Sequence, residues 1–146
     1  MSIIKTFKGQ LPVGNEQKIN LSTADGLTGY KIKEFRVVSK QPGAGNYEII
    51  GKVRLTPDNN ISSEVDFNDT DLMALSLYQD AAGNLNFADT MIIDKEIFNQ
   101  DVFVNVTDAS GNTTPINFYL ELEQIKINLN TSTYHTLKNL RSNQQN

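Results

Sequence analysis

Four acidic residues lie close together in the segment SSEVDFNDTDL, residues 62–72, with an asparagine among them. Calcium takes several oxygen ligands from one compact loop, so these residues are the candidate metal ligands of the chain. The segment begins like an EF-hand loop, but an aspartate stands where that loop needs glycine, and its twelfth position has no glutamate. The alternatives are a solvated acidic loop, or an aspartate that caps a short helical turn. The calcium candidates are Asp66, Asn68, Asp69 and Asp71, with Asp69 as the candidate cap.

Residues that could support catalysis are few. His135 is the only histidine, and the chain has no cysteine to act as a nucleophile or thiolate ligand. Glu121 and Glu123 are two apart, so on a strand they project from the same face, whereas glycosidase carboxylates flank a substrate from opposite sides. We therefore expect no enzymatic activity, no catalytic residue and no cofactor.

Five tyrosines are candidates for a carbohydrate-binding surface, since sandwich proteins often hold sugars on exposed aromatic rings. They are Tyr30, Tyr47, Tyr78, Tyr119 and Tyr134. The glycine-rich segment 41–46, QPGAGN, lacks the Lys-Ser/Thr ending of a phosphate-binding loop and is followed by a strand pattern. We interpret it as a surface loop.

The composition fits a single globular domain. The chain has 146 residues, of which 38% are hydrophobic, and it has no apolar run near the ~20 residues of a membrane-spanning helix. Its first fourteen residues lack the apolar core of a secretory signal. The net charge of −4 argues against a nucleic-acid partner. Residues 1–55 carry +5 and residues 56–146 carry −9, which lets early and late strands, or neighbouring subunits, attract each other.

Alternating apolar and polar residues predict strands along most of the chain. The expected strands are 3–8, 17–21, 30–39, 47–56, 73–79, 85–93, 102–107 and 116–129. Segments 73–93 and 101–129 each look like two strands joined by a polar turn, so we expect two hairpins. Shifts in the apolar phase predict a bulge near Lys33-Glu34, and either a bulge near Gln124 or a bend there into a second sheet. Met73, Leu75 and Leu77 share one face of their strand.

These patterns predict an all-β fold, an antiparallel β-sandwich of jelly-roll type, formed by one domain over residues 1–146. Residues 1–14 include Pro12, which cannot donate a ladder hydrogen bond, so they form an edge strand or an N-terminal arm. Residues 131–146 combine three-to-four spacing of apolar residues with a polar end, which predicts a short C-terminal helix and a tail.

The last third of the chain resembles the C-terminal segments of small virion structural proteins from marine and cyanobacterial tailed phages. Three stretches carry this resemblance. They are Phe98-Asn99-Gln100-Asp101, Asn117-Phe118-Tyr119-Leu120-Glu121-Leu122-Glu123 and Leu137-Lys138-Asn139-Leu140-Arg141.

The resemblance implies a non-enzymatic component of a bacteriophage virion, with capsid decoration favoured over a tail, neck or fibre position. Such a viral protein would bind the major capsid protein and copies of itself as a homo-oligomer, with no nucleic acid or membrane as partner. It would be synthesised in the host cytoplasm and would be located on the capsid surface of the virion. The alternative is a carbohydrate-binding module for host attachment.

Overall fold

A computed structural model describes residues 3–21, 27–81 and 86–126, and every regular element in these ranges is a β-strand. The strands are β1 (Ile3–Leu11), β2 (Glu16–Ile19), β3 (Thr28–Ser39), β4 (Tyr47–Arg54), β5 (Leu72–Asp80), β6 (Asn86–Ile92), β7 (Val102–Asp108) and β8 (Ile116–Lys126). The all-β class predicted from the sequence is confirmed.

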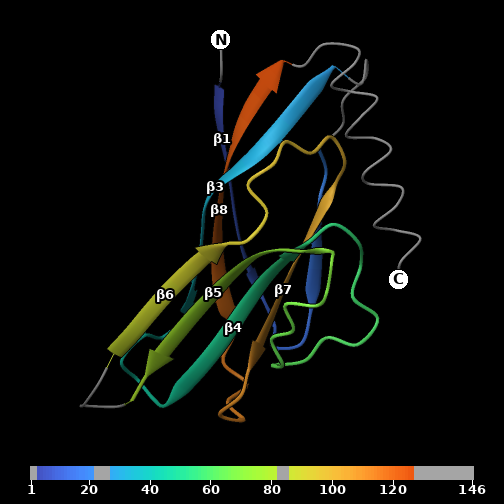
Figure 1. Cartoon of the computed structure of the whole chain (residues 1–146). Helices are drawn as coiled ribbons and strands as arrows, with labels where there is room; N and C mark the ends of the chain where they lie inside the picture. The colour runs from blue at the N-terminus through green and yellow to red at the C-terminus, as the bar shows by residue number, and fades with distance from the viewer. Residues whose placement is uncertain (1–2, 22–26, 82–85, 127–146) are drawn as a thin grey trace.

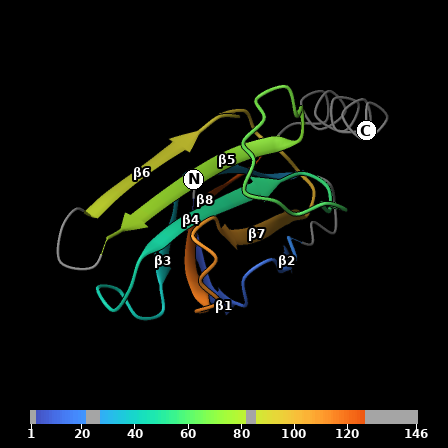
Figure 2. The same cartoon turned by 90° about the horizontal axis from the view of Figure 1, so that it is seen from below.

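The strands form two antiparallel sheets. A three-stranded sheet has the order β1-β8-β3, and a five-stranded sheet has the order β2-β7-β4-β5-β6. Figure 1 shows β8 running along the molecule with β1 and β3 beside it. Seen from below, the five strands from β6 to β2 follow one another across the other sheet (Figure 2).

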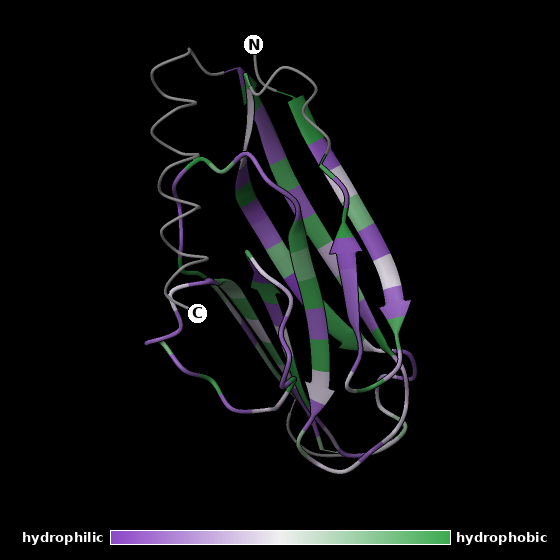
Figure 3. Ribbon diagram, turned by 90° about the vertical axis from the view of Figure 1, so that its right-hand side faces the viewer, coloured by the Kyte–Doolittle hydropathy of each residue, from purple (hydrophilic) through white to green (hydrophobic). Residues whose placement is uncertain are grey.

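One hydrophobic core lies between the two sheets. Apolar side chains alternate with polar ones along several strands, which gives the banded ribbons of Figure 3. The three-stranded sheet contributes Phe35, Leu120 and Leu122, and the five-stranded sheet contributes Val53 and Val104, all fully buried. We call the face of each sheet turned away from this core its outer face.

The two sheets are in close contact at Gly51 of β4. A Cβ atom added there would collide with Cγ1 of Val37 and lie 3.1 Å from Cζ of Phe35, both on β3. The neighbouring Ser76 of β5 accepts a hydrogen bond at 3.2 Å, through its hydroxyl oxygen, from the N–H of Val37. A residue without a side chain and a short hydroxyl therefore bring β3 against β4 and β5.

Most predicted strands are present within a few residues of their expected ends. β5 and β6 pair as expected for a hairpin, from Ala74 opposite Ile92 to Asp80 opposite Asn86. The register of β3 against β8 shifts between Ile32 and Glu34, which confirms the bulge predicted near Lys33. β1 pairs with β8 along its whole length, so residues 3–11 form an edge strand and not a detached arm.

The hairpin predicted over 101–129 is wrong. β7 lies in the five-stranded sheet and β8 in the three-stranded sheet, so the two do not pair. The connection is anchored elsewhere: Oδ1 of Asp108 accepts the N–H of Glu48 at 3.0 Å, and the N–H of Lys40 donates to the carbonyl of Pro115 at 3.0 Å. The seven residues 109–115 are long enough to cross from one sheet to the other, and alternation alone does not specify a pairing partner.

Two further expectations need correction. β8 pairs with β1 and β3 in unbroken register around Gln124, so the bulge expected there is absent and the irregularity lies on β3 instead. Leu75 and Leu77 pair with Lys52 and Ile50 on the outer face of the five-stranded sheet, whereas Met73 joins the core. A register shift between β4 and β5 at the start of β5 separates Met73 from the alternation that follows.

The predicted C-terminal helix and tail, residues 131–146, lie outside the described residues. His135 belongs to this segment. Within the ranges the structure describes, no helix is long and apolar enough to cross a membrane.

We predict that Gly51→Ala destabilises the protein by about 1–3 kcal/mol, because a methyl group would force β3 and β4 apart at a packed contact. Gly45→Ala is the matched control: its added Cβ meets Asn112 and Tyr47 only at ordinary distances of 3.4 Å and 3.5 Å. Urea unfolding of both variants measures the difference. Equal stability of the two variants would contradict a tight sheet contact at Gly51.

Candidate functional site

The connection between β4 and β5, residues 55–71, folds over the outer face of the five-stranded sheet. We call it the cover loop. One row of residues in register crosses all five strands beneath it, and Asn105 in that row is fully buried although it faces outward. The row consists of Glu16, Asn105, Lys52, Leu75 and Met91.

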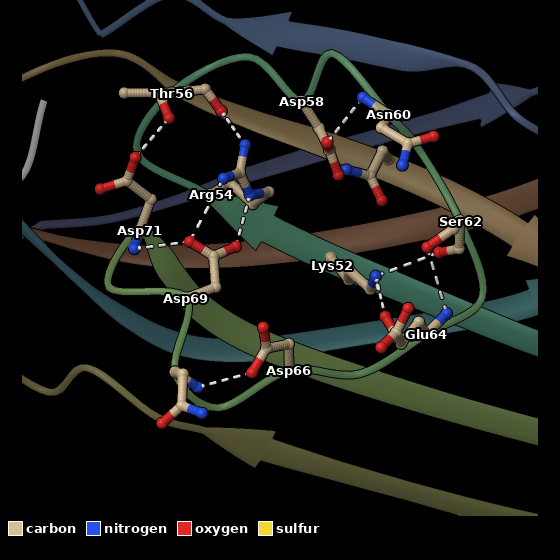
Figure 4. A network of polar contacts seen from close by, with 12 residues as sticks. Lys52, Arg54, Thr56, Asp58, Asn60, Ser62, Glu64, Asp66, Asp69 and Asp71 are labelled. Atoms are coloured by element: carbon tan, nitrogen blue, oxygen red, sulfur yellow. Dashed lines mark hydrogen bonds and ion pairs between the residues drawn. The ribbon is translucent and has the colours of Figure 1, made fainter. Parts of the chain in front are cut away.

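Lys52 fastens the middle of the cover loop to β4. Its Nζ donates to the carbonyl oxygens of Ser62, at 3.0 Å, and Glu64 (Figure 4). Burial lowers the pKa of the Lys52 ammonium, opposed in part by the nearby carboxylate of Asp58. Glu16 of β2 adds a second attachment, because both of its carboxylate oxygens accept the N–H of Asp58 at 3.2 Å.

Arg54 fastens the end of the cover loop. Its Nε and Nη2 donate to the two carboxylate oxygens of Asp69 at 3.0 Å and 3.3 Å, and its Nη1 donates to the carbonyl of Thr56 at 2.9 Å. Burial alone would raise the pKa of Asp69, but the hydrogen bonds from Arg54 and from the N–H of Asp71, with the arginine charge, hold it below its usual value. The pair is a two-pronged ion pair with the arginine side chain only 10% exposed.

The four calcium candidates lie in this loop with separate contacts. The carboxylate of Asp66 accepts the N–H of Asn68 at 2.9 Å and closes a local turn. Asp69 is occupied by Arg54, and Oδ2 of Asp71 accepts the hydroxyl of Thr56 at 2.5 Å. Among the described residues, no group of three or more histidine or acidic side chains is placed to hold a metal ion. The short helical turn proposed after Asp69 is not formed, because β5 begins at Leu72.

A second feature is a hollow of about 700 Å³ on the outer face of the three-stranded sheet. Three residues from each of β1, β8 and β3 line it, and Tyr78 of β5 completes the lining. The middle residues, Gly9, Phe118 and Val37, stand opposite one another, and the side chains of Phe118 and Val37 are buried toward the core. The residues on either side must therefore face outward, because side chains alternate along a strand.

The outward side chains form two parallel rows across the three strands. One row holds two cations on either side of an aromatic ring, and the other holds two amides and a valine. The rows are Lys8, Tyr119 and Arg36, and Gln10, Asn117 and Val38. The floor between the rows is backbone. This combination of a flat ring, amide groups and positive charge is suited to binding a polar organic ligand.

Polar contacts already orient several of these groups. Nε2 of Gln10 donates to Oδ1 of Asn117 at 2.9 Å, and the Arg36 Nε donates to the carboxylate of its neighbour Glu34. The hydroxyl of Tyr119 donates to Oε1 of Glu121 at 3.1 Å, and this bond raises the pKa of Tyr119. The side chains of Gln10, Arg36 and Tyr119 are thus each held near another residue on the outer face of the sheet.

The structure divides the five tyrosine candidates. Tyr30 and Tyr47 are buried in the core, so the expectation that they expose a sugar-binding platform is wrong. Tyr78 and Tyr119 are half-buried and line the same hollow. Tyr134 lies outside the described residues. Sequence reasoning missed the partners on β1 and β3, because only the register of both strands with β8 brings them beside Tyr119.

Glu121 and Glu123 lie on the outer face of β8, as their spacing predicted. Glu121 accepts the Tyr119 hydroxyl, and Glu123 lies 4.0 Å from Nζ of Lys33. Both carboxylates therefore project from one face of one strand and contact residues of their own sheet. This arrangement gives them no opposed geometry around a substrate.

Large apolar side chains are exposed on β6, just after it and in the cover loop. Phe87 and Met91 of β6 are 51% and 47% exposed, and they pair with Gln79 and Leu75 on the outer side of β5. We call the following set the apolar strip: Val65 and Phe67 of the cover loop with Phe87, Met91 and Ile93. Among the described residues, these are five of the eight large hydrophobic side chains that are exposed.

No family model matches this chain, and no curated protein matches it.

We predict that Asp69→Ala lowers the free energy of unfolding by about 1–3 kcal/mol, because Arg54 would keep its burial and lose its carboxylate. Asp66→Ala, in the same loop but exposed, should cost less than about 1 kcal/mol. Because the pKa of Asp69 is lowered on folding, its stabilisation is present above its ordinary value of 3.8 and is lost as the pH falls through the folded-state pKa. Urea unfolding against pH should show this acid-dependent loss in the natural chain and not in Asp69→Ala.

We predict that the Tyr78 phenol ionises late. Burial, followed by its hydrogen bond to Asp80 at 3.1 Å, raises the pKa of Tyr78 to about 12 from 10.0. The stabilisation linked to this shift is complete below pH 10 and is lost as the pH rises toward 12. A near-ultraviolet phenolate titration should contain a late component that is smaller by one tyrosine in Tyr78→Phe. In guanidinium-unfolded protein all tyrosines should titrate together, and the same single transition in folded protein would contradict the assignment.

Proposed function

We propose that this chain is a non-enzymatic structural protein of a tailed-phage virion, placed on the capsid surface as a decoration protein. The observation that carries the proposal is the resemblance of residues 92–141 to the C-terminal segments of small virion structural proteins. Among the described residues, the surface features also favour binding over chemistry. Asp66 and Asp69 of the cover loop are engaged in a turn and in an ion pair, and five large apolar side chains are exposed in the apolar strip.

The strand order supports the finer proposal of a jelly-roll sandwich. In a jelly roll the chain is folded as nested antiparallel pairs that are divided between two sheets. Three nested pairs of that pattern are present, β1 with β8, β2 with β7 and β4 with β5. β6 departs from it, because it pairs with β5 and extends the five-stranded sheet instead of lying beside β3.

The proposed docking surface is the apolar strip, and its proposed occupant is the major capsid protein in the assembled shell. A patch of exposed apolar side chains on an otherwise polar surface is typical of a protein-binding site. Phe67, at 62%, is the most exposed of the large apolar residues described, and hydrogen bonds from Lys52 and Arg54 attach its loop to β4. Copies bound as a homo-oligomer would contact several capsid subunits at once, so weak individual contacts would give firm attachment.

We predict that purified virions of the encoding phage contain on the order of hundreds of copies of this protein, as repeated binding to a capsid lattice requires. Quantitative mass spectrometry against the major capsid protein measures this ratio. About a dozen copies or fewer would place the protein in the tail, neck or fibres instead.

The double variant Phe87→Ser with Met91→Ser should bind particles lacking the protein about tenfold less well. Ile4→Ser, a similarly exposed site on β1, is the matched control and should bind normally.

A further inference from the structure

We infer that the hollow on the three-stranded sheet is a binding site for a short acidic saccharide, one that carries carboxylate groups on its sugar rings. The inference rests on the geometry of the hollow and does not depend on the capsid proposal, which uses the opposite sheet. A volume of about 700 Å³ lies within the roughly 300–1,000 Å³ of small-molecule sites.

Tyr119 provides the platform for a sugar ring. It stands in the middle strand of the sheet, between Lys8 on β1 and Arg36 on β3, with its side chain on the outer face. Its hydroxyl is engaged by Glu121, which fixes the direction of the ring. The C–H face of a pyranose packs on such a ring, and the half-buried tyrosine loses little freedom when it does so.

The amide pair provides recognition of hydroxyl groups. The bond between Gln10 and Asn117 uses one N–H of the glutamine amide and the carbonyl oxygen of the asparagine amide. The glutamine carbonyl and the asparagine NH₂ group are therefore an acceptor and a donor next to each other. Adjacent hydroxyls of a sugar offer the complementary donor and acceptor.

Lys8 and Arg36 favour an acidic sugar over a neutral one, because the carboxylates of Glu34 and Glu121 on the same face are already engaged by Arg36 and by the Tyr119 hydroxyl. Lys8 is exposed and forms no ion pair among the described residues, and the ion pair of Arg36 with Glu34 uses Nε. The ammonium group and the remaining guanidinium N–H groups flank Tyr119 from both sides. A carboxylate on a sugar stacked over the ring would meet a cation on either side, and charge-assisted hydrogen bonds are the stronger ones.

The test measures binding of a galacturonic acid trisaccharide to the full chain by ligand-observed NMR. The neutral galactose trisaccharide is the comparison. We expect the acidic trisaccharide to bind, and Tyr119→Ala to weaken binding about tenfold or more. Tyr119→Phe keeps the ring and should retain binding. Lys8→Met should weaken binding of the acidic trisaccharide and reduce its dependence on salt.

The thermal midpoint of each variant shows whether it is folded, and Ile4→Ala, on β1 outside the hollow, is the control for unspecific effects of substitution. Three outcomes would overturn the inference: no binding of the acidic trisaccharide, equal binding of the neutral one, or binding that survives Tyr119→Ala. Because none of these measurements involves virions, their failure leaves the capsid proposal to be judged on copy number and on binding to particles.

Discussion

The contact between β3 and the β4–β5 pair is the constraint on which the two-sheet arrangement depends. Gly51 lies against Val37 and Phe35 with no space for a side chain, and the Ser76 hydroxyl satisfies the N–H of Val37 at the edge of the other sheet. An unpaired backbone N–H at a buried sheet edge is costly, so this side-chain bond replaces a missing strand neighbour. With β3 fixed there, β8 and β1 follow in register, and the outer face that carries the hollow is set.

Alternation in the sequence was sufficient to locate the strands but not to pair them. The segment from Asp101 to Leu129 contains two strands at the expected positions, yet they belong to different sheets. The side chain of Asp108 accepts the N–H of Glu48 on β4, but an aspartate at this point is equally typical of an ordinary hairpin turn. The faces of β5 were ambiguous for a similar reason, because a covered outer face buries Leu75 as effectively as a core does.

The candidate sites differ in how far the sequence predicted them. The acidic cluster of residues 66–71 was visible as a pattern, but its partner Arg54 comes from β4, and an ion pair across fifteen residues has no sequence signature. Tyr119 was visible as one of five tyrosines, and only burial separates it from Tyr30 and Tyr47. The two rows of the hollow require the register of three strands drawn from both ends of the chain. Register is a property of pairing, and a single strand does not contain it.

The position of β8 has a consequence for the order of events during synthesis. β8 is the central strand of its sheet, with β1 on one side and β3 on the other, although it is the last strand along the chain that the structure describes. Its partners are made first and must wait with their pairing edges open until residues 116–126 leave the ribosome, whereas β4, β5 and β6 find neighbours close in sequence. Long-range closure of this kind slows folding and prolongs the exposure of apolar strand edges. The lysines at positions 5 and 8 of β1 keep that waiting edge charged, a property that discourages premature association with other chains.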